Sequence, residues 1–160
     1  MNSNFYVDVI QQSVATNLSK FISYNGRGNE VAIFETGLDL GRQSGKTKSA
    51  FDIIKKSKGT LNIYVGHNLQ CAKDAAYSNA DTDLINKGIE AYYPNLLILS
   101  KRSIHDYFRG RRIEQQAVNL IFDECDFTYN QRMEIADTIR LCMRVKTHPY
   151  PFIHIIRLGM

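Results

Sequence analysis

Tryptophan and long apolar runs are both missing from this sequence of 160 residues. A helix that crosses a bilayer needs about 20 consecutive apolar residues, and no stretch approaches that length, so no membrane span is expected. The polar amino terminus, Met1 to Asn4, contains no basic segment followed by an apolar run. No signal peptide is therefore visible, and a cytoplasmic location is expected.

Cysteine is scarce, with three residues at Cys71, Cys125 and Cys142. Because the number is odd and no pair has a CxxC spacing, neither a disulfide framework nor a zinc site is expected. We interpret all three as small buried hydrophobic residues. The histidines also lack the spacing of metal ligands, and we interpret them as structural or solvent-facing. They are His67, His105, His148 and His154.

No internal repeat, low-complexity segment or Pro/Ser-rich linker divides the chain, so a single domain over residues 1–160 is expected. The net charge of +4 favours polyanionic partners. The run KRSIHDYFRGRR at residues 101–112 carries five basic residues and one acidic residue, Asp106. This run has two interpretations, a solvated basic face or a patch that contacts DNA or phosphate.

Apolar periodicity predicts helices that alternate with short strands. The expected helices lie at about residues 3–23, 46–56, 68–78, 80–91, 103–108 and 131–145. The expected strands lie at residues 31–34, 61–65, 96–99, 118–122 and 152–156. The first strand reads as buried on both faces, and Leu38 and Leu40 would extend it. This alternation predicts a three-layer α/β domain with a mainly parallel, five-stranded sheet.

A phosphate-binding loop is predicted between the first strand and the helix that follows it. The run GRQSGKT at residues 41–47 ends in the Gly-Lys-Thr of a Walker A motif, although Leu40 occupies the position of the first glycine. Backbone N–H groups of such a loop point at phosphate oxygens, and the following helix adds the positive end of its dipole. Lys46 would reach the β and γ phosphates of ATP, and the Thr47 hydroxyl would ligate Mg²⁺. The predicted nucleotide-binding residues are Gly41, Arg42, Gln43, Ser44, Gly45, Lys46 and Thr47.

Two carboxylates, Asp123 and Glu124, follow the apolar strand at residues 118–122. Adjacent acids at the end of a buried strand cost desolvation energy unless a cation or hydrogen bonds offset it. Asp123 would hold Mg²⁺ as a Walker B aspartate, and Glu124 would act as general base on the attacking water. We therefore expect the tips of two neighbouring strands to bring Lys46 and this acid pair around one magnesium-bound triphosphate.

These two motifs resemble the ATPase domain of the large terminase subunits that package viral DNA. GRQSGKT is similar to that family's deviant Walker A motif, and Arg42 matches the arginine inside it. IFDECDF at residues 121–127 is similar to the family's Walker B motif. The resemblance implies a RecA/ASCE-like P-loop NTPase with ATP and Mg²⁺ as cofactors. It also implies catalytic roles for Arg42 at the γ-phosphate, for Lys46 and for Glu124.

The resemblance implies double-stranded DNA, a portal or other packaging proteins as partners, a homo-oligomeric ring and, for a viral protein, the host cytoplasm. The chain departs from the family because it carries no nuclease domain. Residues 155–160 also replace the Ser/Thr-rich coupling motif expected after the last strand. The glutamine that reads adenine in the family would correspond to Gln11 or Gln12.

The expected function is ATP hydrolysis that drives or regulates the translocation of viral DNA. A non-hydrolysing, nucleotide-binding regulatory subunit is the first alternative, because the chain is short and the coupling motif is missing. A helicase-like translocase fragment is the second alternative.

Overall fold

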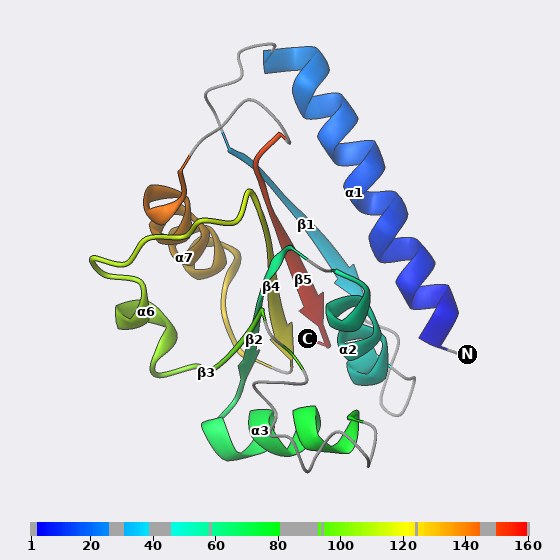
Figure 1. The fold of residues 1–160 in the computed structure, drawn as a ribbon, viewed down its shortest axis with the longest axis vertical. Helices are drawn as coiled ribbons and strands as arrows, with labels where there is room; N and C mark the ends of the chain where they lie inside the picture. The colour runs from blue at the N-terminus through cyan, green and yellow to red at the C-terminus, as the bar shows by residue number, and fades with distance from the viewer. Residues whose placement is uncertain are drawn as a thin grey trace.

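The computed structural model describes residues 3–25, 31–38, 46–57, 59–80, 93, 95–123, 125–144 and 150–159. Helices and strands alternate along this part of the chain (Figure 1). The helices are α1 (Ser3–Asn25), α2 (Lys46–Lys56), α3 (Leu69–Ser78), α6 (Ile104–Tyr107) and α7 (Tyr129–Cys142). The strands are β1 (Ala32–Leu38), β2 (Leu61–Gly66), β3 (Leu96–Ser100), β4 (Ala117–Asp123) and β5 (Phe152–Leu158).

The five strands form one sheet in the order β1-β5-β4-β2-β3, and every pair in it is parallel. Parallel strands require long crossover connections, and helices between successive strands supply them. The strand ends that carry Leu38, Gly66 and Asp123 therefore lie along the same carboxyl edge of the sheet. The expectation of a mainly parallel α/β sheet is confirmed.

Helices cover both faces of this sheet (Figure 1). Helices α1, α2 and α3 pack with Tyr64, Ile121 and Ile156 in one core cluster. Helices α6 and α7 belong to the other cluster, which includes Ile63 and Leu120. Successive side chains of a strand point to opposite faces, so each of β2, β4 and β5 contributes to both clusters.

The expected burial of the first strand on both faces is confirmed in part. Val31 and Ala32 are buried and point to opposite faces, whereas Ile33 and Phe34 are only partly buried. β1 lies at one edge of the sheet, where a strand is covered from fewer sides. The expectation that the two motifs follow neighbouring strands is wrong, because β5 lies between β1 and β4.

The buried face of the amino-terminal helix differs from the apolar stripe that its periodicity predicts, which contains Phe5, Val9, Ile10, Val14, Leu18, Phe21 and Ile22. Ile10 of this stripe is buried, together with Tyr6 and Val7 outside it, whereas Phe5 and Ile22 are exposed. A helix of 23 residues is about 35 Å long, while a strand of seven residues spans about 23 Å. The helix is therefore longer than the strand beside it.

Helix α7 begins two residues before its expected start at residue 131. Thr128 accepts a hydrogen bond from the backbone N–H of Gln131, whose side chain accepts one from the backbone N–H of Thr128. This reciprocal capping box satisfies two backbone donors and determines where the helix begins. Among the described helices, none is long and apolar enough to cross a membrane. The helix expected at residues 80–91 lies outside the described part of the chain.

Candidate functional site

The first turn of α2 meets the end of β4. The Thr47 hydroxyl donates a hydrogen bond of 2.9 Å to Oδ2 of Asp123, 76 residues further along the chain. Asp123 points to the α2 side of the sheet because it follows Ile121 by two residues, and Ile121 packs in the α2 cluster. The structure thus brings together the two residues that were predicted to ligate a metal.

Helix α2 reaches Asp123 although β5 separates β1, the strand before α2, from β4, the strand that ends at Asp123. Two strand spacings amount to about 10 Å, too far for the tips of β1 and β4 to meet directly. Helix α2 instead lies over the sheet, with the Phe51 ring 4.8 Å from the Tyr64 ring on β2. Thr47 reaches the Asp123 carboxylate because α2 lies over the sheet, and not because β1 and β4 are adjacent.

Tyr64 is a third member of this group and was not predicted from the sequence. Its hydroxyl donates a short hydrogen bond to the same Oδ2 atom of Asp123. Tyr64 is buried on β2 opposite Ile121, so its hydroxyl extends toward the carboxyl edge. A tyrosine in a buried strand was a signal, but the partner of its hydroxyl depended on the pairing of β2 with β4.

The structure does not describe most of the other residues predicted for the nucleotide site. Residues 41–45, with Gly41, Arg42, Gln43, Ser44 and Gly45, are not among the described residues, and neither is Glu124. Lys46 is described as the first residue of α2, without its side chain. Their predicted roles stay predictions.

Cys125 attaches the segment after β4 to the end of β2. Its thiol donates to the carbonyl oxygens of Val65, at 3.3 Å, and Asp123, at 3.4 Å. Burial, with the nearby Asp123 carboxylate, raises the pKa of the Cys125 thiol to about 11. The thiol therefore stays protonated near neutral pH and serves as a hydrogen-bond donor rather than a nucleophile.

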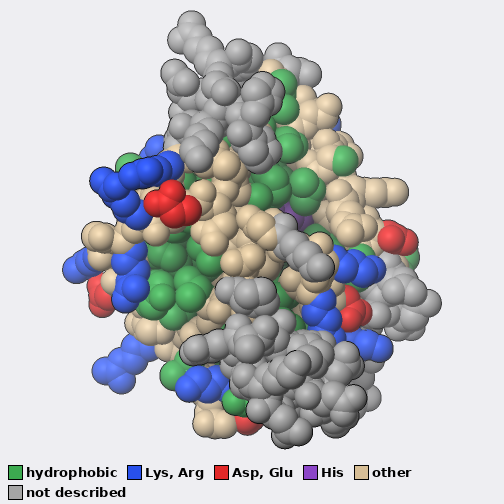
Figure 2. Space-filling model, in the orientation of Figure 1, with side chains coloured by type: hydrophobic (Ala, Val, Ile, Leu, Met, Phe, Trp, Pro, Cys, Tyr) green, Lys and Arg blue, Asp and Glu red, His purple; other side chains and the backbone are tan. Residues whose placement is uncertain are grey.

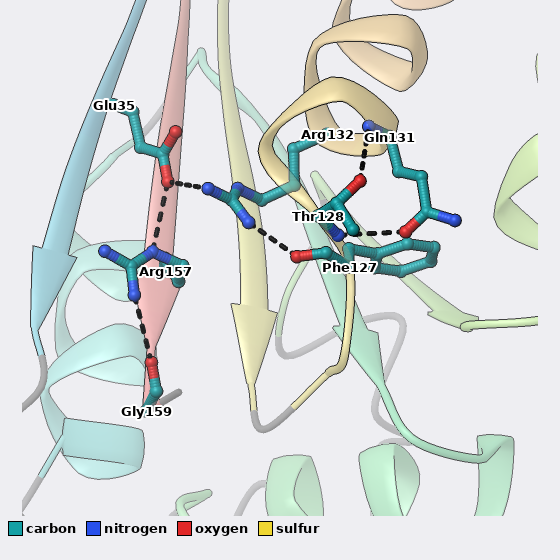
Figure 3. A network of polar contacts seen from close by, with 7 residues as sticks. All are labelled: Glu35, Phe127, Thr128, Gln131, Arg132, Arg157 and Gly159. Atoms are coloured by element: carbon teal, nitrogen blue, oxygen red, sulfur yellow. Dashed lines mark hydrogen bonds and ion pairs between the residues drawn. The ribbon is translucent and has the colours of Figure 1, made fainter.

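A buried ionic network lies on the opposite face of the sheet, close to the same edge (Figure 3). Oε1 of Glu35 on β1 accepts from Arg132 of α7 at 2.9 Å and from Arg157 of β5 at 3.1 Å. Arg132 also donates to the carbonyl oxygen of Phe127 at 2.6 Å. The Arg157 guanidinium lies against Gly37, where a Cβ atom would require it to shift. The network joins β1, β5 and the segment before α7.

The cysteines differ in part from expectation, whereas the described histidines are buried or exposed, as their interpretation as structural or solvent-facing residues allows. Cys125 is buried, but Cys71 is exposed, so the interpretation of all three cysteines as buried was wrong. Cys71 lies beside Ala72 on α3, and Ala72 and Ala76 form the face that packs inward. His154 is fully buried and His67 and His105 are exposed, while His148 lies outside the described residues. Within the described ranges, no group of three His, Cys, Asp or Glu side chains could hold a metal ion.

The remaining candidates lie at the surface or in the core. Gln11 and Gln12 are both exposed on α1. In the basic run, Arg102, Arg109 and Arg112 are exposed. The exposed positions agree with a solvated basic face and leave the alternative of a phosphate-contacting patch open.

The fold and the site define an α/β protein with an all-parallel sheet and a hydroxyl–carboxylate group at its carboxyl edge. Ligands of open α/β sheets bind at this edge. No family model matches the sequence, and searches of curated proteins and of solved structures find no significant match.

Proposed function

We propose that this chain is a P-loop NTPase of the RecA/ASCE-like type that binds Mg–ATP at the carboxyl edge of its sheet and hydrolyses ATP. One observation carries the proposal. The threonine of the Gly-Lys-Thr motif and the aspartate of the Asp-Glu pair, remote in sequence, are joined by a hydrogen bond of 2.9 Å. A chance Gly-Lys-Thr motif would not require its threonine to meet that aspartate.

The oxygen atoms at this site fit a hard divalent cation. Mg²⁺ in nucleotide enzymes is bound by one or two protein oxygens, phosphates and water. Thr47 and Asp123 would supply the protein oxygens, and the Tyr64 hydroxyl would keep the Asp123 side chain in place. When bound, Mg²⁺ would neutralise negative charge on the phosphates.

The chain's own residues would then divide the chemistry among them. The residue 41–45 loop and the start of α2 would bind the phosphates through backbone N–H groups. The Lys46 ammonium and the Arg42 guanidinium would stabilise negative charge that develops at the γ-phosphate. Glu124 would accept a proton from the attacking water. These are the roles implied by the resemblance to terminase ATPase domains.

The biological context follows from the same resemblance. We propose that hydrolysis drives or regulates movement of double-stranded viral DNA, with packaging proteins as partners and a ring of identical chains as the assembly. The net charge of +4 supports a polyanionic partner.

Steady-state ATP hydrolysis with Mg²⁺ tests the enzymatic part of the proposal. The wild type should turn over, Glu124→Gln should bind ATP without turnover, and Lys46→Ala should lose binding. Lys48→Ala is the matched control, because Lys48 is exposed on the same helix and should behave as wild type. A wild type that binds ATP without turnover would favour the regulatory alternative, and strand separation would favour the helicase-like one. No ATP binding at all would end the proposal.

A further inference from the structure

A pocket of about 300 Å³ lies at the opposite edge of the sheet from the candidate nucleotide site. Its walls come from the start of β2, the start of β3 and the segment that joins α6 to β4. It is lined by Leu61, Leu97, Tyr107, Phe108, Arg111, Arg112, Ile113 and Gln115. Strands of five to seven residues separate the two edges by about 20 Å. The pocket is therefore distinct from the group around Asp123.

The wall of this pocket is held in place by backbone and side-chain contacts. Gly110 has a φ of 70°, a left-handed conformation that favours glycine, and it turns the chain after α6. The backbone N–H of Ile113 donates to the carbonyl oxygen of Cys142 at 2.9 Å, and that of Arg144 donates back to Ile113 at 3.4 Å. These hydrogen bonds hold the segment between α6 and β4 against the end of α7. The wall of the pocket is therefore an ordered part of the fold.

The pocket combines an apolar floor with a positively charged rim. Leu61 and Ile113 are buried in the floor, while Arg111 and Arg112 are exposed above it. The neighbouring Arg109 pairs with Asp106 at 3.4 Å. Neither Arg111 nor Arg112 forms an ion pair with the residues that the structure describes. Figure 2 shows Lys and Arg side chains gathered around an exposed hydrophobic patch on the α6 side of the molecule.

The aromatic rings of the pocket argue against stacking of a nucleic-acid base. Proteins that hold single strands present open aromatic faces. The Arg111 guanidinium already lies 4.1 Å from the centroid of the Tyr107 ring, and Phe108 is buried and meets Tyr107 edge to face. The remaining floor is aliphatic, which suits an apolar side chain rather than a base.

We propose that this pocket binds an acidic peptide segment of a partner protein that inserts one apolar side chain, such as leucine or phenylalanine. The pocket volume lies at the lower end of ligand sites, a size suited to one anchoring side chain. Arg111 and Arg112 meet carboxylates on either side of the anchor, and stacking on Tyr107 holds the Arg111 guanidinium in place. The Gln115 amide offers a donor and an acceptor to the peptide backbone.

This site would lie at one end of β4 and the candidate nucleotide site at the other. The segment of residues 108–116 leads directly into β4, which ends at Asp123. The inference does not depend on ATP binding, because the pocket is defined by residues that take no part in the group around Asp123.

Fluorescence anisotropy with labelled short peptides tests the inference. The panel contains a central leucine or phenylalanine flanked by aspartate and glutamate, a version with alanine as the anchor, and a version with asparagine and glutamine in place of the acids. An acidic, anchored peptide should bind the wild type. Loss of the anchor should weaken binding by about tenfold or more, as expected for a buried apolar side chain. Loss of the acids should weaken it and remove its salt dependence.

Charge reversal locates the binding site. The double variant Arg111→Glu/Arg112→Glu should bind the acidic peptide at least about tenfold more weakly. The matched control Arg102→Glu/Arg109→Glu makes the same change in net charge on exposed residues outside the pocket and should bind like the wild type. Thermal unfolding of both variants verifies that they fold.

Three results would overturn the inference. They are the absence of binding across the whole panel, equal losses in both double variants, and tighter binding of a single-stranded oligothymidylate that competes with the peptide. The last result would assign the pocket to nucleic acid. The inference and the proposed ATPase fail separately, since one is read from peptide binding and the other from nucleotide turnover.

Discussion

His154 is a buried histidine whose neutral form the fold favours. It lies on β5 under α1, and its Nε2 atom is 2.8 Å from the Thr36 hydroxyl, which also contacts the Ser13 hydroxyl through a short hydrogen bond. Burial lowers the pKa of His154 from its ordinary value of 6.5 to about 4. These contacts join α1, β1 and β5 at a position where a positive charge would be poorly solvated.

The stability of the protein should therefore fall in mild acid. Between pH 6.5 and about 4 the unfolded chain binds a proton at His154 that the native protein does not. The free energy of unfolding should fall by up to about 1.4 kcal/mol per pH unit, and by about 3 kcal/mol in all. Urea unfolding at pH 7 and pH 5 measures this change. His154→Gln should flatten the pH dependence, whereas His67→Gln, at an exposed position, should leave it as in the wild type.

The Tyr64 hydroxyl should by itself contribute to the stability of the protein. Tyr64→Phe keeps the buried ring and removes a hydrogen bond to the Asp123 carboxylate. Because hydrogen bonds to charged groups contribute about 1.5–3 kcal/mol, the free energy of unfolding should fall by about 2 kcal/mol. Chemical denaturation checks this, with Tyr77→Phe at an exposed position as the control. Equal stability of the two variants would mean that the hydroxyl does not support the carboxylate.

The ionic network of Glu35 connects three secondary-structure elements. Glu35 and Arg132 side chains are only 15% and 11% exposed, so their charges are largely removed from water. Such a pair is sensitive to loss of one member, because the remaining charges stay buried without compensation. The network therefore determines how α7 sits against β1 and β5.

Removal of the Glu35 carboxylate should be strongly destabilising. Glu35→Ala leaves the guanidinium groups of Arg132 and Arg157 beside each other, and we expect a loss of about 3 kcal/mol in the free energy of unfolding. The matched control is Asp137→Ala, which breaks an exposed pair with Arg140 and should cost under about 1 kcal/mol. Similar losses in the two variants would show that burial does not govern the network.

Most helices and strands were predictable because their signals are local. β2 was predicted with nearly its observed bounds from the apolar run at residues 61–65. α2 was predicted in the same way from apolar residues at helical spacing, among them Ala50, Phe51 and Ile54. The start of α7 was missed, although Thr128 and Gln131 carry a capping signature in the sequence. The exposed end of α1 was not predictable, because it depends on the length of the neighbouring strand rather than on the helix itself.

Binding of Mg–nucleotide should raise the thermal stability of the whole molecule. A ligand that binds only the native state at about 100 times its Kd adds about 2.7 kcal/mol. For a domain of this size, that corresponds to an increase in Tm of about 5–10 °C. Differential scanning calorimetry with a slowly hydrolysed ATP analogue measures the shift.

The shift should depend on Mg²⁺ and on Asp123. Asp123→Asn keeps the shape of the side chain and removes its charge, so the Mg²⁺-dependent part of the shift should disappear. Asp126→Asn provides the control, since Asp126 is an exposed carboxylate three residues away. A shift that persists in Asp123→Asn would place the nucleotide away from this edge.

The amino-acid pattern alone was sufficient to predict an α/β sheet and to select Thr47 and Asp123, because periodicity and short motifs are properties of neighbouring residues. The metal-binding roles of Thr47 and Asp123 and the catalytic roles of Arg42, Lys46 and Glu124 remain predictions. Three-dimensional packing was needed to order the strands, to insert β5 between β1 and β4, and to bring Tyr64 to Asp123 and both arginines to Glu35. Such contacts join residues far apart in the chain. Which of these contacts form is decided by the burial of both sheet faces, and no local sequence pattern encodes that burial.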